Sequence, residues 1–398
     1  MADDRHVIVA GAGIAGLTAA LALARAGFRA TVLEQSPQLE ETGAGIQLSP
    51  NATRILIDLG LYDRLAPFIV MPHAIRVMSG SSGREITRIP LGDVAARRYG
   101  APFWTIHRGD LQAALADTAQ NTLDVTVKLG LRLDDFAAHS YGITVQAYRG
   151  RQVVDERGMA LIGADGIWSQ VSNRLQRQSK PQFTHRTAWR ALVPAESVPM
   201  HFRSDLINLW LGLDGHLVLY PVKGGRLINI VGIVHDEWNQ AGWQAAGARD
   251  EILRRFARFS WAEEVRSLIG IPDRWLKWAL YDRTQAFRGG EGPVTLMGDA
   301  AHPMLPFLAQ GAGMAIEDAA VIADSLKRHQ GDAPRGLRDY ENVRRARTAK
   351  AQHVARKQGK LYGQTGPEAF FRNLGMKLLG GESLLKRYDW LYNWKPPA

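Results

Sequence analysis

The stretch His6-Val7-Ile8-Val9-Ala10-Gly11-Ala12-Gly13-Ile14-Ala15-Gly16 decides the fold. A short apolar, β-branched run leads into three glycines spaced as G-x-G-x-x-G, and an Ala/Leu-rich segment follows over residues 17–26. This order predicts a strand, a tight turn and a helix, with Gly27 ending the helix and a second strand over residues 30–33. The sequence therefore predicts a βαβ unit at the start of an α/β domain.

The three glycines have distinct roles in such a turn. Gly11 permits the tight turn, Gly13 lets a pyrophosphate approach the backbone, and Gly16 lets the helix pack closely on the strand. The pyrophosphate is expected on the helix N-terminus near Ala15, where free N–H groups and the helix dipole favour negative charge. Glu34 ends the second strand and is placed to accept a hydrogen bond from an adenosine ribose hydroxyl. This motif alone does not separate FAD from NAD.

Two later turns indicate FAD. Gly163-Ala164-Asp165-Gly166 and Gly298-Asp299 each follow a short apolar strand. Gly298 keeps side-chain bulk away, so that Asp299 can accept a hydrogen bond from a ligand hydroxyl, most simply a ribityl oxygen. Gln310-Gly311-Ala312-Gly313-Met314 then opens a helix, and its free N–H groups suit the negative charge that builds on a reduced flavin ring.

Composition excludes several function classes. The 398 residues suffice for two to three domains, and the 46% hydrophobic and 22% charged content is typical of folded globular proteins. The chain has no cysteine, so redox chemistry needs a bound cofactor, and its 11 scattered histidines show no metal-ligand spacing, so no metal site is predicted. No apolar run reaches the ~18 residues of a membrane span. Met1-Ala2-Asp3-Asp4-Arg5 does not resemble a signal peptide, and we expect a cytoplasmic protein without membrane contact.

The net charge of +10 is concentrated near the C-terminus, among helix-forming residues. The basic residues there are Arg335, Arg338, Arg344, Arg345, Arg347, Lys350, Arg356, Lys357 and Lys360. We interpret them as a solvated helical face, and nucleic-acid binding as the weaker hypothesis, because no recognition module or interleaved aromatic residues accompany them. A positive field would also favour small anionic ligands. The aromatic residues Trp390, Tyr392 and Trp394 are predicted to pack in the core, with a dimer contact as the alternative.

The three motifs together resemble a known family. GAGIAG (11–16), GADGIWS (163–169) and GDAAHPMLPFLAQGAGMAIEDA (298–319) resemble, in order and separation, the single-component FAD-dependent aromatic hydroxylases, the group of salicylate hydroxylase and p-hydroxybenzoate hydroxylase. GAGIQLSPN (43–51) and HRGDL (107–111) extend the match over nearly the whole chain. Pro90-Leu91-Gly92 and Tyr99-Gly100 are similar to 6-hydroxynicotinate 3-monooxygenases.

This resemblance implies an α/β fold with a Rossmann-like FAD-binding domain of the p-hydroxybenzoate hydroxylase type, an inserted substrate domain with a mixed or antiparallel sheet, and a helical C-terminus. The FAD-binding domain is expected over residues 1–74, 99–180 and 283–398, the last with the C-terminal helices, and the substrate domain over residues 75–98 and 181–282. The residues predicted to hold the cofactor are Gly11, Gly13, Ala15, Gly16, Glu34, Gln35, Gly45, Ile46, Arg108, Leu131, Asp165, Asp299, Gly311, Ala312, Gly313 and Met314. By the resemblance, Arg108 contacts FAD and Leu131 touches its adenine.

The resemblance also implies a reaction. NADH or NADPH would reduce FAD, the reduced flavin would capture O2 as a C4a-hydroperoxide, and the terminal oxygen would pass to an electron-rich aromatic ring. The substrate would be a small phenol or hydroxypyridine that carries a carboxylate. A flavin epoxidase or heteroaromatic oxidase and a flavin-binding regulatory protein stay open as alternatives, and so do a monomer and a homodimer.

The candidate catalytic residues depart from one branch of this family. The 6-hydroxynicotinate enzymes carry His at the position of Gln47 and Cys at those of Ala301 and Gly313, and Gln47 cannot act as a base at neutral pH. The substitutes in the sheet region are His216, Tyr220 and Arg190, the last for a substrate carboxylate. A histidine satisfied by packing and a surface arginine are the alternatives for His216 and Arg190. His302 is interpreted as a structural residue that fixes the turn after Asp299.

Overall fold

The computed structural model describes residues 5–39, 44–176, 179–240, 245–257, 260–283, 287–330 and 332–396. Met1 to Asp4 and Gly43, which contributed to the sequence predictions, lie outside the described residues. None of the described helices is both long and apolar enough to cross a membrane.

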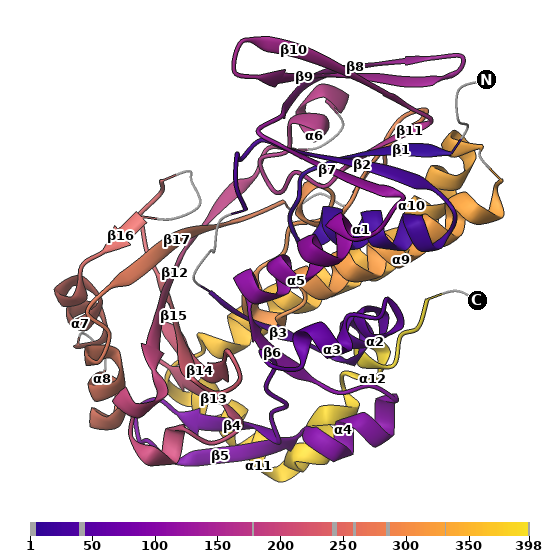
Figure 1. Ribbon diagram of the computed structural model, residues 1–398. Helices are drawn as coiled ribbons and strands as arrows, with labels where there is room; N and C mark the ends of the chain where they lie inside the picture. The colour runs from indigo at the N-terminus through magenta and orange to yellow at the C-terminus, as the bar shows by residue number, and fades with distance from the viewer. Residues whose placement is uncertain are drawn as a thin grey trace.

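A five-stranded parallel sheet begins with the strand of the glycine motif (Figure 1). Its strands, in spatial order, are β18 (Val294–Leu296), β11 (Ala160–Gly163), β1 (His6–Ala10), β2 (Arg29–Glu34) and β7 (Val125–Leu129). The helix α1 (Ile14–Arg25) lies below this sheet in Figure 1 and packs against α5 (Arg108–Gln120) and α9 (Gly311–Arg328). The predicted βαβ unit is confirmed, because β1 and β2 pair in parallel on either side of α1.

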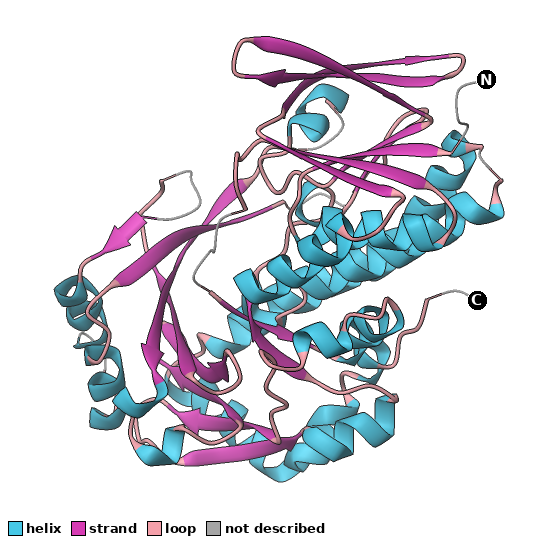
Figure 2. Cartoon of the chain, viewed as in Figure 1, coloured by secondary structure: helices cyan, strands magenta, loops and turns pink. Residues whose placement is uncertain are grey.

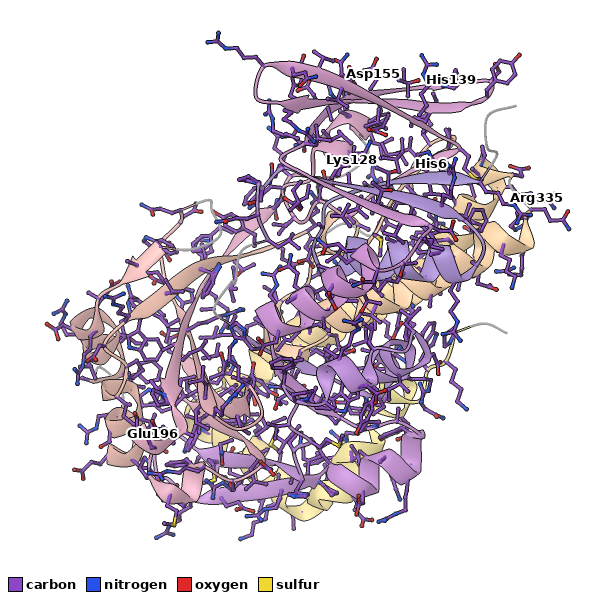
Figure 3. All side chains as sticks on the ribbon, viewed as in Figure 1. His6, Lys128, His139, Asp155, Glu196 and Arg335 are labelled. Carbon is purple, nitrogen blue, oxygen red and sulfur yellow. The ribbon has the colours of Figure 1, made fainter. Side chains whose placement is uncertain are left out.

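A three-stranded antiparallel sheet lies on the opposite side of the parallel sheet (Figure 2). It consists of β10 (Gln152–Gly158), β9 (Gly142–Arg149) and β8 (Arg132–His139), and α6 (Gln170–Leu175) packs against β8. Figure 3 places Lys128 on the parallel sheet and Asp155 and His139 on the three-stranded one. Lys128 forms an ion pair with Glu156, which ties the two sheets together.

An eight-stranded mixed sheet forms the other half of the molecule. Its strands, in spatial order, are β16 (Ala245–Gly247), β17 (Trp275–Asp282), β12 (Gln182–Pro194), β15 (Leu227–His235), β14 (Gly215–Val222), β13 (Leu206–Gly212), β4 (Ala74–Ser79) and β5 (Glu85–Pro90). Neighbouring strands are antiparallel except β13 and β4, which run parallel. The predicted fold class is therefore confirmed, whereas the limits of the two domains stay a prediction.

The alternation of side chains along β14 gives this sheet two different faces. Leu217 and Leu219 are buried in a core with α7 (Arg249–Ala257) and α8 (Glu263–Gly270), which cover one face. His216, Val218 and Tyr220 point to the other face, toward the C-terminal helices. Those helices are α10 (Ala333–Tyr362), α11 (Gly366–Lys386) and α12 (Asp389–Tyr392).

A two-stranded sheet lies between the two halves. It pairs β3 (Gly45–Leu48) with β6 (Trp104–His107) in antiparallel fashion. Three helices accompany it: α2 (Pro50–Asp58), α3 (Tyr62–Leu65) and α4 (Gly92–Tyr99). Short 3₁₀ turns complete the chain at Ala195–Ser197, Met200–Phe202, Gly298–Ala300 and Pro306–Leu308. The turn at Gly298–Ala300 packs against α9, and the turn at Pro306–Leu308 packs against α10.

Candidate active site

The glycine-rich loop and the two glycine-acid turns meet at the carboxyl ends of β1, β11 and β18. A Cβ atom on Gly11, whose φ is +102°, would lie 2.7 Å from the carbonyl oxygen of Ala164 in the first turn. A Cβ atom on Gly298 in the second turn, whose φ is +56°, would lie 3.1 Å from Cβ of Ala15 in α1. Segments far apart in the sequence therefore share one confined space, which these glycines leave open.

The start of α1 is prepared for an anion. A Cβ atom on Gly16 would lie 1.9 Å from the carbonyl oxygen of Gly11, so the helix rests directly on the loop. Gly13 is the N-cap, and no side chain caps the helix or places an acidic group in its first turn. The space beside Gly13 is open to 4 Å. The first-turn N–H groups of α1 are thus available to a pyrophosphate, and the residues fit the predicted cofactor.

Arg283 holds the two glycine-acid turns together, and sequence reasoning missed it. Its guanidinium donates hydrogen bonds to the carbonyl oxygens of Ala300 (2.8 Å) and Ile167 (2.9 Å), one in each turn. The side chain is buried, and burial lowers its pKa, an effect opposed by Asp165 and Asp299. No local pattern marks this arginine, because its partners are distant in the sequence. The carboxylate of Asp165 itself accepts hydrogen bonds from N–H groups in the first turn of α6.

Glu34 lies beside the glycine loop as predicted from its spacing, but its carboxylate is already engaged. It accepts hydrogen bonds from the backbone N–H groups of Ala12 and Ser36, each at 2.8 Å. These bonds fix the loop that a ribose would contact. Leu131 reaches the same edge, because its N–H donates to the carbonyl oxygen of Glu34 at 2.8 Å, while its side chain is buried in the core. Gln35 is exposed at the end of β2.

Asp299 faces the N-terminus of α9. A Cβ atom on Gly311 would lie 3.9 Å from Oδ1 of Asp299, so the carboxylate and the first turn of α9 border the same space. The side chain is exposed to solvent, yet surrounding protein atoms raise its pKa, an effect opposed by His302, Arg108 and Arg283. Within the described residues no hydrogen bond from the protein reaches this carboxylate. The group is therefore ready to accept one from a ligand.

The remaining α9 residues of the prediction differ in position. Gly311 and Ala312 are half-buried in the first turn, whereas Gly313 and Met314 are buried. The N–H group of Met314 already donates to the carbonyl oxygen of Gln310 at 2.8 Å. A Cβ atom on Gly313 would lie 3.0 Å from the side-chain oxygen of Gln310, whose amide donates to Ser49 at 2.7 Å. The N–H groups of Gly311 and Ala312 are thus the better candidates to meet a flavin.

Arg190, Tyr220 and Gly45 come together near Arg108. A Cβ atom on Gly45 would lie 2.7 Å from the ring of Tyr220. The guanidinium of Arg190 stacks on Trp278, at 4.7 Å from the ring centroid, and its Nε has no hydrogen-bond partner. Burial lowers the pKa of Arg190, with Arg108 acting in the same direction, and burial raises the pKa of Tyr220. Arg190 is half-buried and its Nε is shielded from solvent, so it differs from a fully exposed surface arginine, and its role stays a prediction.

A second residue missed by the sequence analysis fixes this cluster. Asn229 on β15 is fully buried, and its side-chain oxygen accepts a hydrogen bond from the N–H of Gly45 at 2.8 Å. Its side-chain nitrogen has no partner. Asn229 therefore attaches β3 to the eight-stranded sheet and presents an unused donor beside Tyr220 and Gly45.

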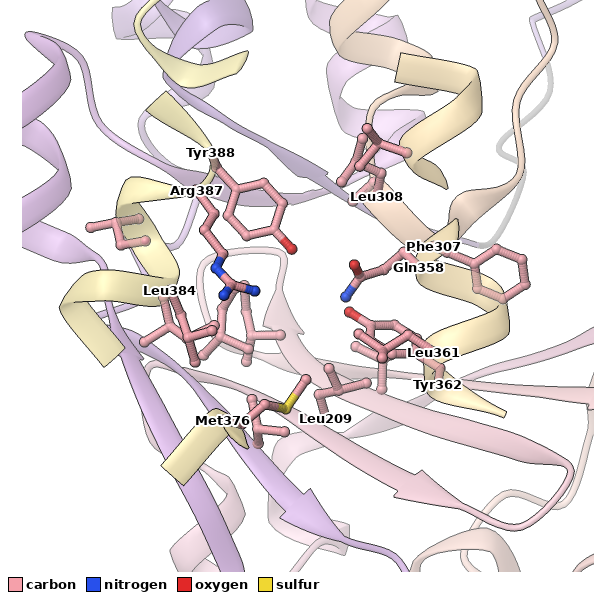
Figure 4. A pocket seen from close by; sticks show the side chains of 18 of the residues that line it. Leu209, Phe307, Leu308, Gln358, Leu361, Tyr362, Met376, Leu384, Arg387 and Tyr388 are labelled. Atoms are coloured by element: carbon pink, nitrogen blue, oxygen red, sulfur yellow. The ribbon is translucent and has the colours of Figure 1, made fainter. Parts of the chain in front are cut away.

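A cavity of about 500 Å³ lies between the eight-stranded sheet and the C-terminal helices (Figure 4). Its lining residues come from β3, β4, β5, β13, β14, α10, α11 and α12, and from residues 306–309 just before α9. Gln47 and His216 are among them, whereas Arg190 and Tyr220 are not. Two of the four predicted catalytic residues therefore line this cavity, and the other two lie near Arg108. Ile46, a predicted cofactor residue, directly precedes Gln47 on β3.

His216 is a buried and neutral histidine. Its ring packs against Phe307, at 5.4 Å between centroids, and Tyr362, at 5.1 Å. Burial, and then Arg186, lowers its pKa to about 3. Its Nδ1 has no hydrogen-bond partner, so the ring is packed but not satisfied. His216 therefore lines the cavity as an uncharged ring at neutral pH, with its Nδ1 enclosed by protein atoms.

We expect this histidine to make folding stability depend on pH. An unfolded histidine binds a proton near pH 6.5, whereas folded His216 does so near pH 3. The unfolded state thus binds more protons in this window, and stability falls with decreasing pH by up to about 1.4 kcal/mol per pH unit through this group. Urea unfolding at pH 7, 6 and 5 should show a flatter profile for His216→Asn than for the parent. His353→Asn, at an exposed position, is the control, and equal profiles for both variants would contradict the assignment.

The basic C-terminal region is not simply a solvated face, and that prediction is wrong for its central residues. Arg344 is buried and donates hydrogen bonds to Asp318 (2.7 Å) and Glu317 (2.5 Å), both fully buried on α9. Arg347 also binds Glu317, and Arg356 binds Asp282 at 2.6 Å. Arg338 likewise forms an ion pair, with Glu341. Arg345, by contrast, is exposed, as expected for a solvated face. These arginines neutralise buried carboxylates, an arrangement that a local reading of the helix cannot reveal.

The same network includes His302 and the aromatic tail. His302 is buried, and its Nε2 lies 2.6 Å from the carboxylate of Asp318, which also accepts the N–H of Gly298 at 2.9 Å. This geometry agrees with a structural role for His302 in the turn. Tyr392 is buried in the core. The guanidinium of Arg347 lies over the rings of Trp390 and Trp394, at 5.8 and 5.0 Å from their centroids.

Comparisons with known proteins agree with these features. Residues 4–355 match the sequence family described as FAD binding domain. The chain is 34% identical over 391 residues to 3-hydroxybenzoate 6-hydroxylase of Polaromonas naphthalenivorans (strain CJ2), covering 98% of this chain and 96% of the relative. It is 35% identical over 392 residues, with the same coverage, to 3-amino-4-hydroxybenzoate 2-monooxygenase PtmB3 of Streptomyces platensis. A solved salicylate hydroxylase substrate complex is similar with a TM-score of 0.81 and 28% identity, over 98% of this chain and 96% of that one.

Proposed function

The chain belongs to the FAD-dependent aromatic hydroxylases, and on this premise we propose that it hydroxylates a phenolic, carboxylated ring with NADH or NADPH and O2. The relatives named above act on hydroxybenzoates or salicylate, as their names state. FAD, when bound, supplies the redox chemistry by taking electrons from the nicotinamide and activating O2. The protein binds and orients both partners and excludes water.

The observation that carries this proposal is the position of the cavity relative to the glycine motifs. Residues 306–309 line the cavity, and Gly311 begins α9 two residues later, beside Asp299. Gln47 lines it from β3, two residues after Gly45. A ring in this cavity would therefore lie next to the residues proposed to hold the flavin.

We assign roles to the chain's own residues from their surroundings. Asp299 and the N–H groups of Gly311 and Ala312 would hold the polar edge of FAD, and the first turn of α1 its pyrophosphate. His216, neutral and lining the cavity, would accept a hydrogen bond from the phenol, with Gln47 as a second polar contact. Tyr220 stays protonated, since burial raises its pKa, and is available as a donor.

Arg190 does not line the cavity but lies near Tyr220 on the same sheet, and we propose that it attracts a carboxylate attached directly to the aromatic ring. Arg190→Met should raise KM for 3-hydroxybenzoate by about 10- to 100-fold, as expected for the loss of a charged hydrogen bond. It should leave KM for uncharged 3-hydroxybenzamide nearly unchanged. Arg190→Lys, which keeps the charge but loses the stacking on Trp278, serves as the control. Equal losses with both substrates, together with a lower FAD affinity, would instead assign Arg190 to the cofactor.

A substrate screen tests the function itself. NADH and NADPH oxidation should be measured over hydroxybenzoates and hydroxypyridines, with hydroxylated product and hydrogen peroxide quantified together. We expect at least one phenolic acid to give product without matching peroxide. A protein that binds FAD but responds to no aromatic compound would contradict the proposal and favour a regulatory flavoprotein. A protein that does not retain added FAD would contradict both.

A further inference from the structure

The cavity is larger than one aromatic ring requires. Its volume of about 500 Å³ is roughly three times the ~150 Å³ that holds benzene in an engineered protein core. It lies within the range of sites that bury drug-sized ligands. A hydroxybenzoate next to His216 and Gln47 would therefore leave most of the cavity unfilled.

The cavity opens to the surface at α11. Phe371 and Leu379 on α11 line the cavity and are also 67% and 41% exposed. Arg387, just after α11, likewise both lines the cavity and is exposed. Side chains that meet both conditions mark an opening. The opening is therefore formed by α11 and Arg387, whereas Gln47 lines the cavity from β3.

Most of the side chains that line the cavity are apolar. Leu209 from the sheet, Leu361 from α10, and Met376 and Leu384 from α11 face one another across it (Figure 4). Such side chains gain free energy by covering apolar ligand surface, while Gln358, Tyr362 and Tyr388 add polar groups to the same lining.

The opening carries an unpaired positive charge. No Asp or Glu lines the cavity, whereas Arg372 and Arg387 do. The guanidinium of Arg372 is occupied, since it donates to the carbonyl oxygens of Leu361 and Tyr362. The guanidinium of Arg387 is directed into the cavity (Figure 4), and no acidic side chain in the described ranges pairs with it. An anion at this position would find its counter-charge.

Resting on the function proposed above, we propose that the substrate is a phenol whose ring carries an extended apolar substituent ending in an anionic group. The ring lies at His216 and Gln47, the substituent follows the wall formed by Leu209, Leu361 and Met376, and the anionic end meets Arg387. Hydroxybenzoates are then short substrates that use only the inner end of the cavity.

A series of ligands of increasing length tests this assignment. The probes are ω-(3-hydroxyphenyl)alkanoates and their 4-hydroxy isomers, from the acetate to the octanoate, with 3-hydroxybenzoate as the ring-only reference. Dissociation constants are measured on the FAD-loaded enzyme by perturbation of the flavin absorption spectrum. Each buried methylene should tighten Kd by about fourfold until the chain reaches Arg387. Binding that weakens steadily with every added methylene in both series overturns the proposal.

Variants locate the substituent in the cavity. Met376→Trp should weaken binding of the octanoate by more than about tenfold, since it blocks the wall, and leave 3-hydroxybenzoate unchanged. Leu361→Trp blocks the same path from α10 and serves as the second variant. Leu378→Trp, which is 77% exposed on α11 and does not line the cavity, is the matched control and should change neither ligand. Arg387→Met should cost about tenfold with the octanoate but not with an alkylphenol of equal length.

The two proposals fail in different ways. Turnover of 3-hydroxybenzoate without any gain from longer chains overturns the extended substituent and keeps the hydroxylase. Tight binding of the octanoate without hydroxylation of any phenol overturns the proposed function and supports the ligand class of the cavity.

Discussion

Replacing Arg344 with methionine is expected to lower the free energy of unfolding by about 3–5 kcal/mol. The guanidinium is buried and donates to Asp318 at 2.7 Å, to Glu317 at 2.5 Å and to the carbonyl oxygen of Met314 at 3.2 Å. Removing it leaves two fully buried carboxylates short of a counter-charge, and such an uncompensated charge costs more than the pair itself contributes. Urea unfolding of parent and variant, both without FAD, measures the difference.

The pH dependence of this variant supplies a second readout. Although burial raises the pKa of Asp318, His302 and Arg344 outweigh it and hold the pKa below its usual value. Without Arg344 the pKa should rise, so the variant should recover part of its lost stability on moving from pH 8 to pH 5, where protonation removes the buried charge. Arg345→Met, on the exposed side of the same helix turn, is the matched control and should stay within about 0.5 kcal/mol of the parent. Equal losses in the two variants would refute the buried network.

The contrast between these two arginines shows where prediction from sequence stops. The cofactor motifs are recognised locally, because the spacing of their glycines is visible within a few residues, although Gly11 and Gly298 then approach Ala164 and Ala15 far along the chain. Their chemistry could be predicted without knowing the rest of the chain. Arg344 and Arg345 are indistinguishable at that level, since both stand among helix formers. What separates them is which one faces α9, a property of tertiary packing.

One signal could have located the network. Glu317 and Asp318 stand within the apolar run Met314-Ala315-Ile316-Glu317-Asp318-Ala319-Ala320-Val321. Two adjacent carboxylates in an otherwise apolar helix cannot both be buried without cationic partners, so they require basic residues elsewhere. The nearby basic cluster was the obvious source.

The candidate active site could also be predicted only in part, because some of its residues are marked in the local sequence and others come together through tertiary packing. Residue type and a position in the sheet region indicate His216, comparison with the 6-hydroxynicotinate enzymes indicates Gln47, and both residues line the cavity. The far wall of the cavity, with Met376 and Arg387, could not be foreseen. It forms only because α11 packs against β5, far away in the sequence.

Replacing Asp299 with alanine is expected to remove FAD without harming the fold. The carboxylate borders the space between α1 and the start of α9, and among the described residues it receives no hydrogen bond from the protein. Loss of a hydrogen bond to a charged acceptor costs about 1.5–3 kcal/mol, so the dissociation constant for FAD should rise on the order of 10- to 100-fold. Flavin content after gel filtration and titration of the FAD-free protein by flavin fluorescence both measure this change.

Stability without the cofactor separates this role from a structural one. Because its surroundings raise the pKa of Asp299 in the folded state, the ionised carboxylate opposes folding above pH 4, and its removal should leave the FAD-free protein as stable as the parent or more stable at pH 7. Asp324→Ala, which breaks an ion pair with Arg328 on the same helix α9, is the control and should retain FAD. A variant of Asp299 that unfolds more easily without FAD, as the Arg344 variant should, would assign the carboxylate to the fold. A variant that retains FAD with unchanged affinity would show that the Asp299 carboxylate does not bind the cofactor.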